Sequence, residues 1–141
     1  MFQAVPGGFS TAVIAFAGAS TGLLPGDHGF HVHEFGDLSN RRLGAGLQYN
    51  LFISPHGGQD DPPPSTHVGD LGNIMTPVSP SLYFASGPTT FVIHDSFVTF
   101  TGNRGIVERA IVVHEKKDDL GRGRDAESRR TGNAGARIAC G

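Results

Sequence analysis

The stretch Gly29-Phe30-His31-Val32-His33-Glu34-Phe35-Gly36-Asp37 places two histidines one residue apart in an apolar run typical of a β-strand. Because alternate side chains of a strand leave the same face, His31 and His33 are predicted to point the same way. Two imidazoles held together suit copper or zinc. The stretch therefore predicts a strand that carries part of a metal site.

Three further segments place a histidine beside acidic or glycine-rich residues. They are His56-Gly57-Gly58, HVGDLGN at residues 67–73 and HEKKDDLG at residues 114–121. Imidazole and carboxylate groups are common ligands of zinc and copper. These segments strengthen the interpretation of a metal centre.

The length and composition indicate a single domain spanning residues 1–141. The 21 glycines and 9 prolines favour a turn-rich β protein over a helical one. The net charge of −2 gives no general attraction to nucleic acid or anionic membranes. No run reaches the ~18 apolar residues of a membrane span. We therefore expect neither nucleic acid nor a membrane among the partners.

The cysteine count bears on the cellular compartment. Cys140 is the only cysteine, so no disulfide can form within the chain, and we expect a cytoplasmic protein. The segment TAVIAFAGAS at residues 11–20 resembles the apolar part of a signal peptide, but no positively charged segment precedes it. We interpret this segment as a strand.

Short β-type runs are separated by turn formers along most of the chain. Strands are predicted at residues 11–17, 29–35, 82–84, 90–94, 97–101, 106–114 and 136–140. Two long polar stretches separate them, 37–70 and 116–135, the second with a helical turn near 124–130. This pattern predicts an all-β sandwich or Greek-key barrel with two long loops of functional importance.

Four blocks in this order resemble the copper/zinc superoxide dismutase family. They are GFHVHEFGD (29–37), HVGDLGN (67–73), VVHEKKDDLG (112–121) and TGNAGARIACG (131–141), and the similarity runs from about residue 22 to 141. The resemblance implies an immunoglobulin-like, eight-stranded antiparallel Greek-key barrel. It also implies that one long loop carries zinc ligands and that the other shapes the electric field near copper. Because residues 1–10 can supply at most one short strand, we expect the family's N-terminal hairpin to be incomplete.

The resemblance also assigns roles to individual residues. It implies copper ligands at His31, His33 and His114. It implies zinc ligands at His56, His67 and Asp70. Asp118 matches the carboxylate that links a copper ligand to a zinc ligand, and Arg137 matches the catalytic arginine that guides the superoxide anion. His28 and His94 match no ligand, and surface positions are expected for both.

The activity implied is the copper-dependent disproportionation of superoxide to dioxygen and hydrogen peroxide. Copper and zinc are the implied cofactors, superoxide is the substrate, and a copper chaperone is the implied partner for metal loading. An alternative is a non-catalytic dismutase-like protein that binds metal or acts as a scaffold. A chaperone domain is one variant of this alternative, and the single cysteine counts against it.

One departure from the family pattern affects the metals directly. Gln48 stands where the family has a histidine that bridges copper and zinc. A glutamine cannot become an imidazolate, and its carbonyl oxygen can at most ligate one of the two metals weakly. We therefore expect weaker zinc binding and activity below that of a complete family member.

Two further departures affect the scaffold. Arg42 stands where the family has the cysteine that pairs with the one matching Cys140, so that disulfide is missing. Glu108 stands at a glycine of the family's apolar dimer contact. Because an unpaired carboxylate is costly to bury, the usual homodimer is not expected.

Overall fold

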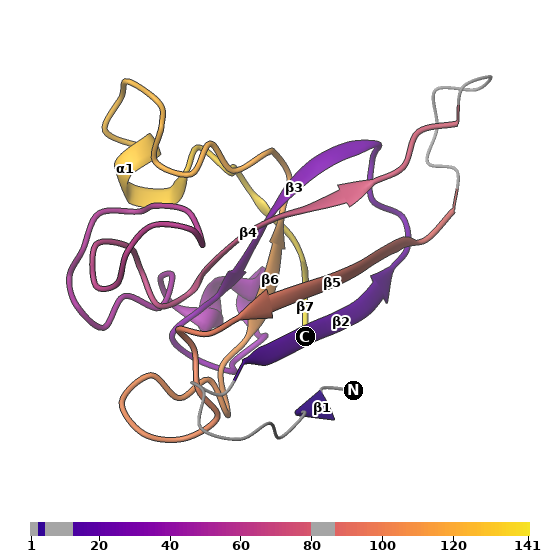
Figure 1. Ribbon diagram of the computed structural model, residues 1–141. Helices are drawn as coiled ribbons and strands as arrows, with labels where there is room; N and C mark the ends of the chain where they lie inside the picture. The colour runs from indigo at the N-terminus through magenta and orange to yellow at the C-terminus, as the bar shows by residue number, and fades with distance from the viewer. Residues whose placement is uncertain (1–2, 5–12, 80–86) are drawn as a thin grey trace.

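The computed structural model describes residues 3–4, 13–79 and 87–141, which form two antiparallel sheets (Figure 1). The first sheet has the order β1-β2-β5, with β1 (Gln3–Ala4), β2 (Ile14–Ser20) and β5 (Thr89–Asp95). The second has the order β4-β3-β6-β7, with β3 (Gly26–Val32), β4 (Asp70–Thr76), β6 (Ile111–His114) and β7 (Arg137–Cys140). The predicted all-β antiparallel fold is confirmed. No helix among the described residues is long and apolar enough to cross a membrane.

The core lies between the two sheets because each contributes alternate apolar side chains to it. Phe16 of β2 and Phe30 of β3 meet edge to face with ring centroids 6.4 Å apart, and both are almost completely buried. Val32 joins the same core two residues after Phe30. His31 stands between these two core residues and therefore leaves β3 from the opposite face. The alternation that builds the core thus also directs His31 towards the loops.

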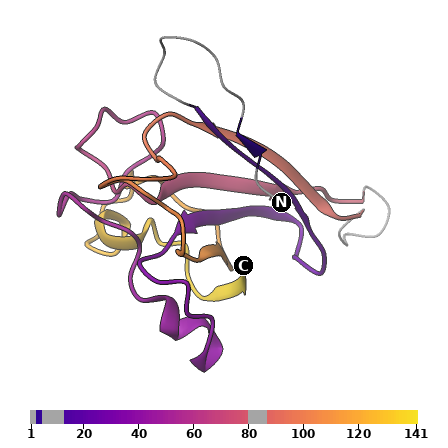
Figure 2. The same ribbon diagram turned by 90° about the horizontal axis from the view of Figure 1, so that it is seen from below.

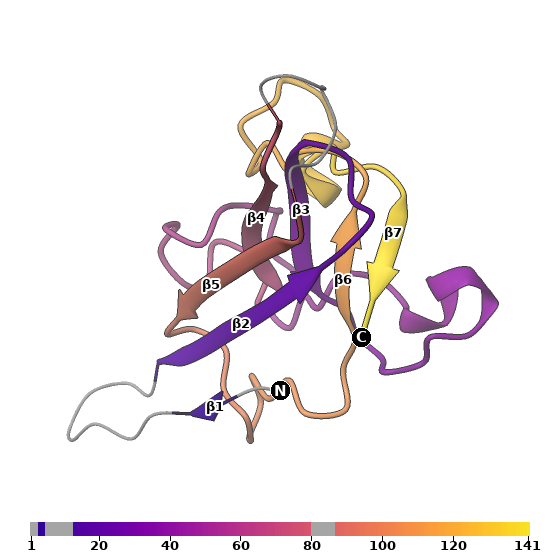
Figure 3. The ribbon, with the colours of Figure 1, turned by 90° about the vertical axis from the view of Figure 1, so that its right-hand side faces the viewer.

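Two long connections link strands of the second sheet. The chain between β3 and β4 contains the short 3₁₀-helix η1 (Asn40–Ala45), and the chain between β6 and β7 contains α1 (Ser128–Thr131). Figures 1 and 2 show the loop that precedes β4 and the loop with α1 on the same side of the sheets. The backbone of His56 donates a hydrogen bond to the carbonyl of Arg129 at 2.7 Å, which joins the two loops. Figure 3 shows β6 and β7 side by side, with η1 projecting beyond them.

Two predicted strands are wrong in whole or in part. Residues 97–101 form a turn with only an isolated bridge, because Asp95 Oδ1 accepts hydrogen bonds from the backbone N–H groups of Phe97 and Val98. The strand predicted at 106–114 begins only at Ile111. Glu108 before it has a left-handed φ of 66°, which a strand does not accommodate.

The other strand boundaries shift by a few residues, and one strand was missed. β3 begins at Gly26 and ends at Val32, three residues earlier at each end than predicted. The pattern does not reveal β4, since Gly72 and Asn73 interrupt its apolar residues. The strand predicted at 82–84 lies outside the described residues. β1 pairs with β2 through two residues, and the missing N-terminal hairpin stays a prediction.

Candidate metal centre

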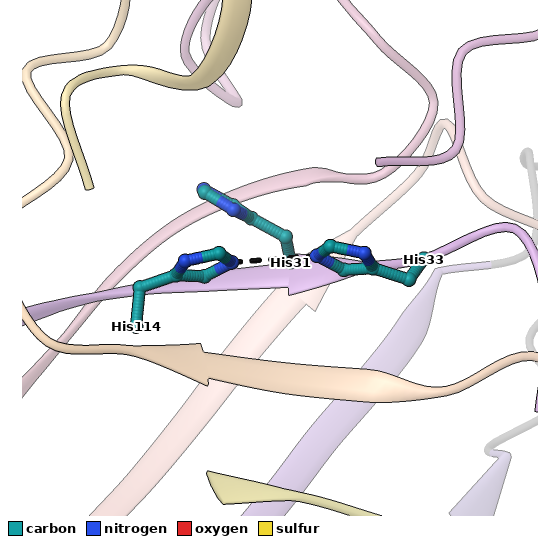
Figure 4. Close-up of side chains that lie close together, drawn as sticks. All are labelled: His31, His33 and His114. Carbon is teal, nitrogen blue, oxygen red and sulfur yellow. Dashed lines mark hydrogen bonds between the residues drawn. The ribbon is translucent and has the colours of Figure 1, made fainter. Parts of the chain in front are cut away.

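Three histidines from β3 and β6 form the first group, which we call the three-histidine cluster (His31, His33 and His114). His31 lies on β3, His33 directly after it, and His114 at the end of β6, which pairs with β3. All three are buried, and one nitrogen from each lies within 4.8 Å of the others. Figure 4 shows the rings converging, with the Nε2 atoms of His33 and His114 separated by 3.3 Å. The residues expected to bind copper are thus brought together.

The ring nitrogens that face away from this cluster are held by acceptors. His33 Nδ1 donates to the carbonyl of Gly46 at 3.1 Å, and His114 Nδ1 donates to that of Gly135 at 3.1 Å. His31 Nε2 donates to Asp118 Oδ2 at 2.7 Å. A neutral imidazole has one N–H, so an imidazole that donates outward in this way presents a lone pair on its inward nitrogen.

The inward ring nitrogens of His33 and His114 do not take up protons near neutral pH. Burial lowers the pKa of His33 to about 3 and that of His114 to about 4, although hydrogen bonds to backbone carbonyls oppose the shift. Both imidazoles are therefore neutral near pH 7. Lone pairs that face one another in a buried site are satisfied by a cation, and three imidazoles form a donor set that suits copper. The residues present thus fit the metal that the resemblance implies.

The second group is the Asp70 cluster (His56, His67 and Asp70), which is contributed by the loop before β4 and by the first residue of β4. Asp70 Oδ1 lies 2.9 Å from His56 Nδ1 and 3.2 Å from His67 Nδ1. Asp70 Oδ2 accepts hydrogen bonds from the backbone N–H groups of Gly57 and His67 and from the Thr66 hydroxyl. Because Oδ2 is saturated in this way, Oδ1 and the two Nδ1 atoms remain as a donor set suited to zinc.

Asp118 links the two clusters from a fully buried position. Its Oδ2 accepts from His31 Nε2 and its Oδ1 from His56 Nε2, both at 2.7 Å. Asn73 of β4 holds the Asp118 backbone through two hydrogen bonds, of 2.8 and 2.9 Å. Gly132 lies against this link with a φ of 66°, and a Cβ at that position would overlap Asp118 Oδ1. Position 132 therefore requires glycine, because a larger residue there would overlap the Asp118 side chain.

Charge distinguishes His56 from the three-histidine cluster. Burial by itself would lower its pKa, but the hydrogen bonds to Asp118 and Asp70 outweigh burial and raise the pKa to about 9. The same contacts hold the pKa of each carboxyl group below its usual value despite burial. Without metal, His56 is therefore an imidazolium between two carboxylates, and a metal ion must displace its proton.

Gln48 occupies the space beside the Asp70 cluster. The residue is 8% exposed, and its backbone forms an isolated bridge with His33. Its Oε1 lies 3.2 Å from His56 Nδ1 and 3.1 Å from His67 Nδ1, while its Nε2 donates to Asp70 Oδ1. Within the described part of the chain, no hydrogen bond joins its amide to the three-histidine cluster. The side chain thus serves one cluster and does not connect the two.

Arg137 lines the cavity that opens over the three-histidine cluster. The cavity has a volume of about 400 Å³ and is also lined by His31, His33, His114 and Gln48. The Arg137 guanidinium donates to the carbonyl of Arg42 at 2.6 Å and to that of Gly46. The Arg42 side chain donates in return to the carbonyl of Arg137 at 3.2 Å. Sequence reasoning identified Arg42 as the position of a lost cysteine and did not predict this reciprocal contact.

Comparison with known proteins agrees with this geometry. The family model for copper/zinc superoxide dismutase (SODC) matches residues 3–141. The chain belongs to the copper/zinc superoxide dismutase family. It is 47% identical over 129 residues to an extracellular superoxide dismutase of Haemonchus contortus, covering 92% of this chain and 66% of that protein. It is 46% identical over 132 residues to an extracellular superoxide dismutase of Caenorhabditis elegans, covering 94% of this chain and 56% of that protein.

Two further matches extend over a larger share of the matched protein than the two extracellular dismutases do. A copper/zinc superoxide dismutase of Dictyostelium discoideum is 44% identical over 128 residues, which are 91% of this chain and 78% of that protein. The crystal structure of the clock protein EA4 superposes with a TM-score of 0.84 at 40% identity, covering 99% of this chain and 81% of that one. This structural similarity supports the fold assignment over nearly the whole chain.

Four residues outside the clusters were also considered from the sequence. His28 is not at the surface as expected. It is 3% exposed on β3, with its ring nitrogens 2.9 Å from the His114 carbonyl and 2.8 Å from the Leu24 carbonyl. The error arose because β3 begins before His28 and not after it. His94 is exposed, Glu108 is exposed, and Cys140 is a partly buried free thiol beside Ala45, Ala110 and Val112.

Proposed function

We propose that this chain is a superoxide dismutase in which copper is held by His31 Nδ1, His33 Nε2 and His114 Nε2. The observation that carries the proposal is the convergence of three imidazole nitrogens beneath a cavity whose wall includes the Arg137 guanidinium. Copper supplies the one-electron exchange that disproportionation of superoxide requires. Zinc is assigned to His56, His67 and Asp70, and Asp118 orients one ligand of each metal.

Arg137 has the role of attracting and orienting the substrate. Superoxide is an anion, and an arginine remains protonated at physiological pH even where burial lowers its pKa, as it does for Arg137. The carbonyls of Arg42 and Gly46 hold the guanidinium at the cavity wall. A fixed positive charge beside the metal raises the local concentration of an anionic substrate.

Gln48 sets the expected level of activity. Its amide does not titrate near neutral pH, so it cannot deliver a proton to the departing peroxide. We assign that delivery to water in the cavity, and we propose a turnover below that of family members with a bridging histidine.

The test is superoxide consumption by protein reconstituted with copper and zinc. We expect turnover well above that of the same copper concentration bound to an unrelated protein, and loss of this turnover in His33→Ala. Arg137→Ala is expected to lower turnover and to weaken its dependence on salt, since it removes the attracting charge. Gln48→His is expected to raise turnover.

A non-catalytic metal-binding role is the second candidate, and the position of Gln48 favours it. The residue that would couple the two metals instead bonds within the Asp70 cluster. Wild-type protein that binds both metals but consumes no superoxide, together with an inactive Gln48→His variant, would support this role. An inactive wild type with an active Gln48→His variant would show that only the bridge is missing.

Compartment and assembly are part of the proposal. The names of relatives from H. contortus, C. elegans and Drosophila melanogaster weigh against the cytoplasmic compartment expected from the cysteine count, since all three are extracellular dismutases. We propose metal loading by a copper chaperone. We also propose that the usual homodimer is disfavoured by the exposed Glu108 carboxylate, which sedimentation velocity of Glu108→Gly against wild type would test.

A further inference from the structure

The atoms around the Asp70 cluster include one oxygen that the ligand assignment above leaves out. Gln48 Oε1 lies 3.2 Å from His56 Nδ1 and 3.1 Å from His67 Nδ1. Asp70 Oδ1 lies 2.9 and 3.2 Å from the same two nitrogens. The two oxygens and two nitrogens therefore form a closed ring in which every nitrogen contacts both oxygens.

The four nitrogen–oxygen separations of this ring are compatible with four of the six edges of a tetrahedral zinc ligand shell. Ligands about 2.0–2.1 Å from zinc are separated from one another by roughly 3.3–3.4 Å. All four nitrogen–oxygen separations lie within about half an ångström of that edge length. Two imidazoles, a carboxylate and an amide oxygen also form a nitrogen and oxygen donor set of the kind zinc accepts.

The orientation of the Gln48 amide follows from its partners. The oxygen and nitrogen of an amide are distinguished by hydrogen bonding. The end facing Asp70 Oδ1 must be the N–H₂ group, because an amide oxygen there would face a carboxylate oxygen. The carbonyl oxygen is therefore the end that faces the two histidines.

We propose that Gln48 is the fourth zinc ligand, through Oε1, and that this role separates the zinc site from the copper site. The inference rests on the zinc assignment in the proposed function but not on superoxide turnover. Amide coordination replaces a negatively charged imidazolate with a neutral oxygen. The four protein ligands of zinc would then carry one negative charge in total, from Asp70. Copper would then be held by the three histidines of the three-histidine cluster alone, beneath the cavity lined by Arg137.

Zinc and copper affinities, each measured by competition with a chromophoric chelator, test this role without superoxide. Gln48→Met keeps the side-chain length but removes the oxygen, and Gln48→Asn keeps the amide but withdraws it by one methylene. We expect both variants to lose at least about tenfold in zinc affinity. Removing a group that merely supports a metal ligand already costs about that much. Gln48→Glu, which keeps an oxygen at the same distance, is expected to bind zinc at least as tightly as wild type. Copper affinity is expected to stay within about twofold in Gln48→Met and Gln48→Asn.

Cobalt(II) at the zinc site gives a spectroscopic readout of the ligand shell. We expect wild type to show the intense visible bands of four-coordinate cobalt, and Gln48→Asn to shift or weaken them. Unchanged zinc affinity and cobalt spectra in both loss variants would overturn the proposal, as would a loss of copper affinity with zinc affinity intact. Far-UV circular dichroism selects the variants that fold, and His33→Ala is the matched control that should lose copper and keep zinc.

Discussion

The three-histidine cluster and the Asp70 cluster are organised by different forces. The first is carried mainly by two paired strands, and its inward ligand atoms include no carboxylate oxygen. The second lies mostly in a loop and is held by two buried carboxylates, Asp70 and Asp118, around a charged His56. Strand pairing by itself can thus bring side chains with potential ligand atoms together. A loop needs charge and a dense hydrogen-bond network to do the same.

The largest effect is expected from the group that both clusters share. Asp118→Ala leaves His31 Nε2 and His56 Nε2 buried without an acceptor, and we expect about 3–5 kcal/mol less stability in the metal-free protein. Affinity for both metals is expected to fall by about 10–100-fold. Denaturant unfolding and chelator competition measure the two effects. A loss confined to one metal would contradict the link between the clusters.

The next test separates the two clusters. Asp70→Asn keeps the shape but removes a charge that accepts from Gly57, Thr66 and His67, and we expect a loss of about 1–3 kcal/mol in the metal-free protein. His33→Gln removes a neutral imidazole with one backbone hydrogen bond, and we expect a loss of about 0.5–1.5 kcal/mol. Unfolding curves of metal-free protein compare them. Equal losses would show that the two clusters depend on charge to the same degree.

The metal-free protein is expected to lose stability on both sides of neutrality. The raised pKa of His56 contributes stability that is complete below about pH 6.5 and is lost as the pH rises through about 9. The lowered pKa values of His33 and His114 have the opposite sign. Unfolded imidazoles take up protons below about pH 6.5, whereas the folded ones resist protonation down to about pH 3 for His33 and about pH 4 for His114.

Urea unfolding between pH 5 and pH 9.5 measures this dependence. His56→Gln is expected to remove most of the alkaline loss and to leave the acid loss in place. A wild-type stability that changes in one direction across the whole range would contradict the contrast between the clusters.

The smallest effect is expected at the reciprocal contact between Arg42 and Arg137. Arg42→Ala removes one hydrogen bond to the Arg137 carbonyl, and we expect a loss of about 0.5–1.5 kcal/mol. Arg122→Ala, which removes an exposed ion pair with Asp61, is the control and should cost less stability than Arg42→Ala, because solvent screens an exposed pair. Thermal unfolding of both variants measures the difference. No difference between them would show that Arg42 is not needed where the disulfide is missing.

The residues of the clusters could be predicted because each lies within a distinctive local block. The pairing of His31 and His33 follows from strand alternation, and the roles expected for Asp118 and Asp70 follow from the resemblance of their blocks to the family. Strand ends were less predictable. Asp95 diverts the chain through side-chain hydrogen bonds, and Glu108 takes a left-handed backbone conformation, so neither position follows from apolar periodicity. β4 was missed for a related reason, since its pairing with β3 overrides the glycine within it.

The sequence by itself determined the family and the all-β class, and it selected the side chains that we propose as metal ligands, because these depend on residue types at short spacings. It also showed that Gln48 cannot bridge two metals. Only the tertiary structure decided where that amide goes, which carbonyls hold Arg137, and that His28 is buried. Each of these depends on contacts between segments far apart in the chain, whose distances no local pattern contains.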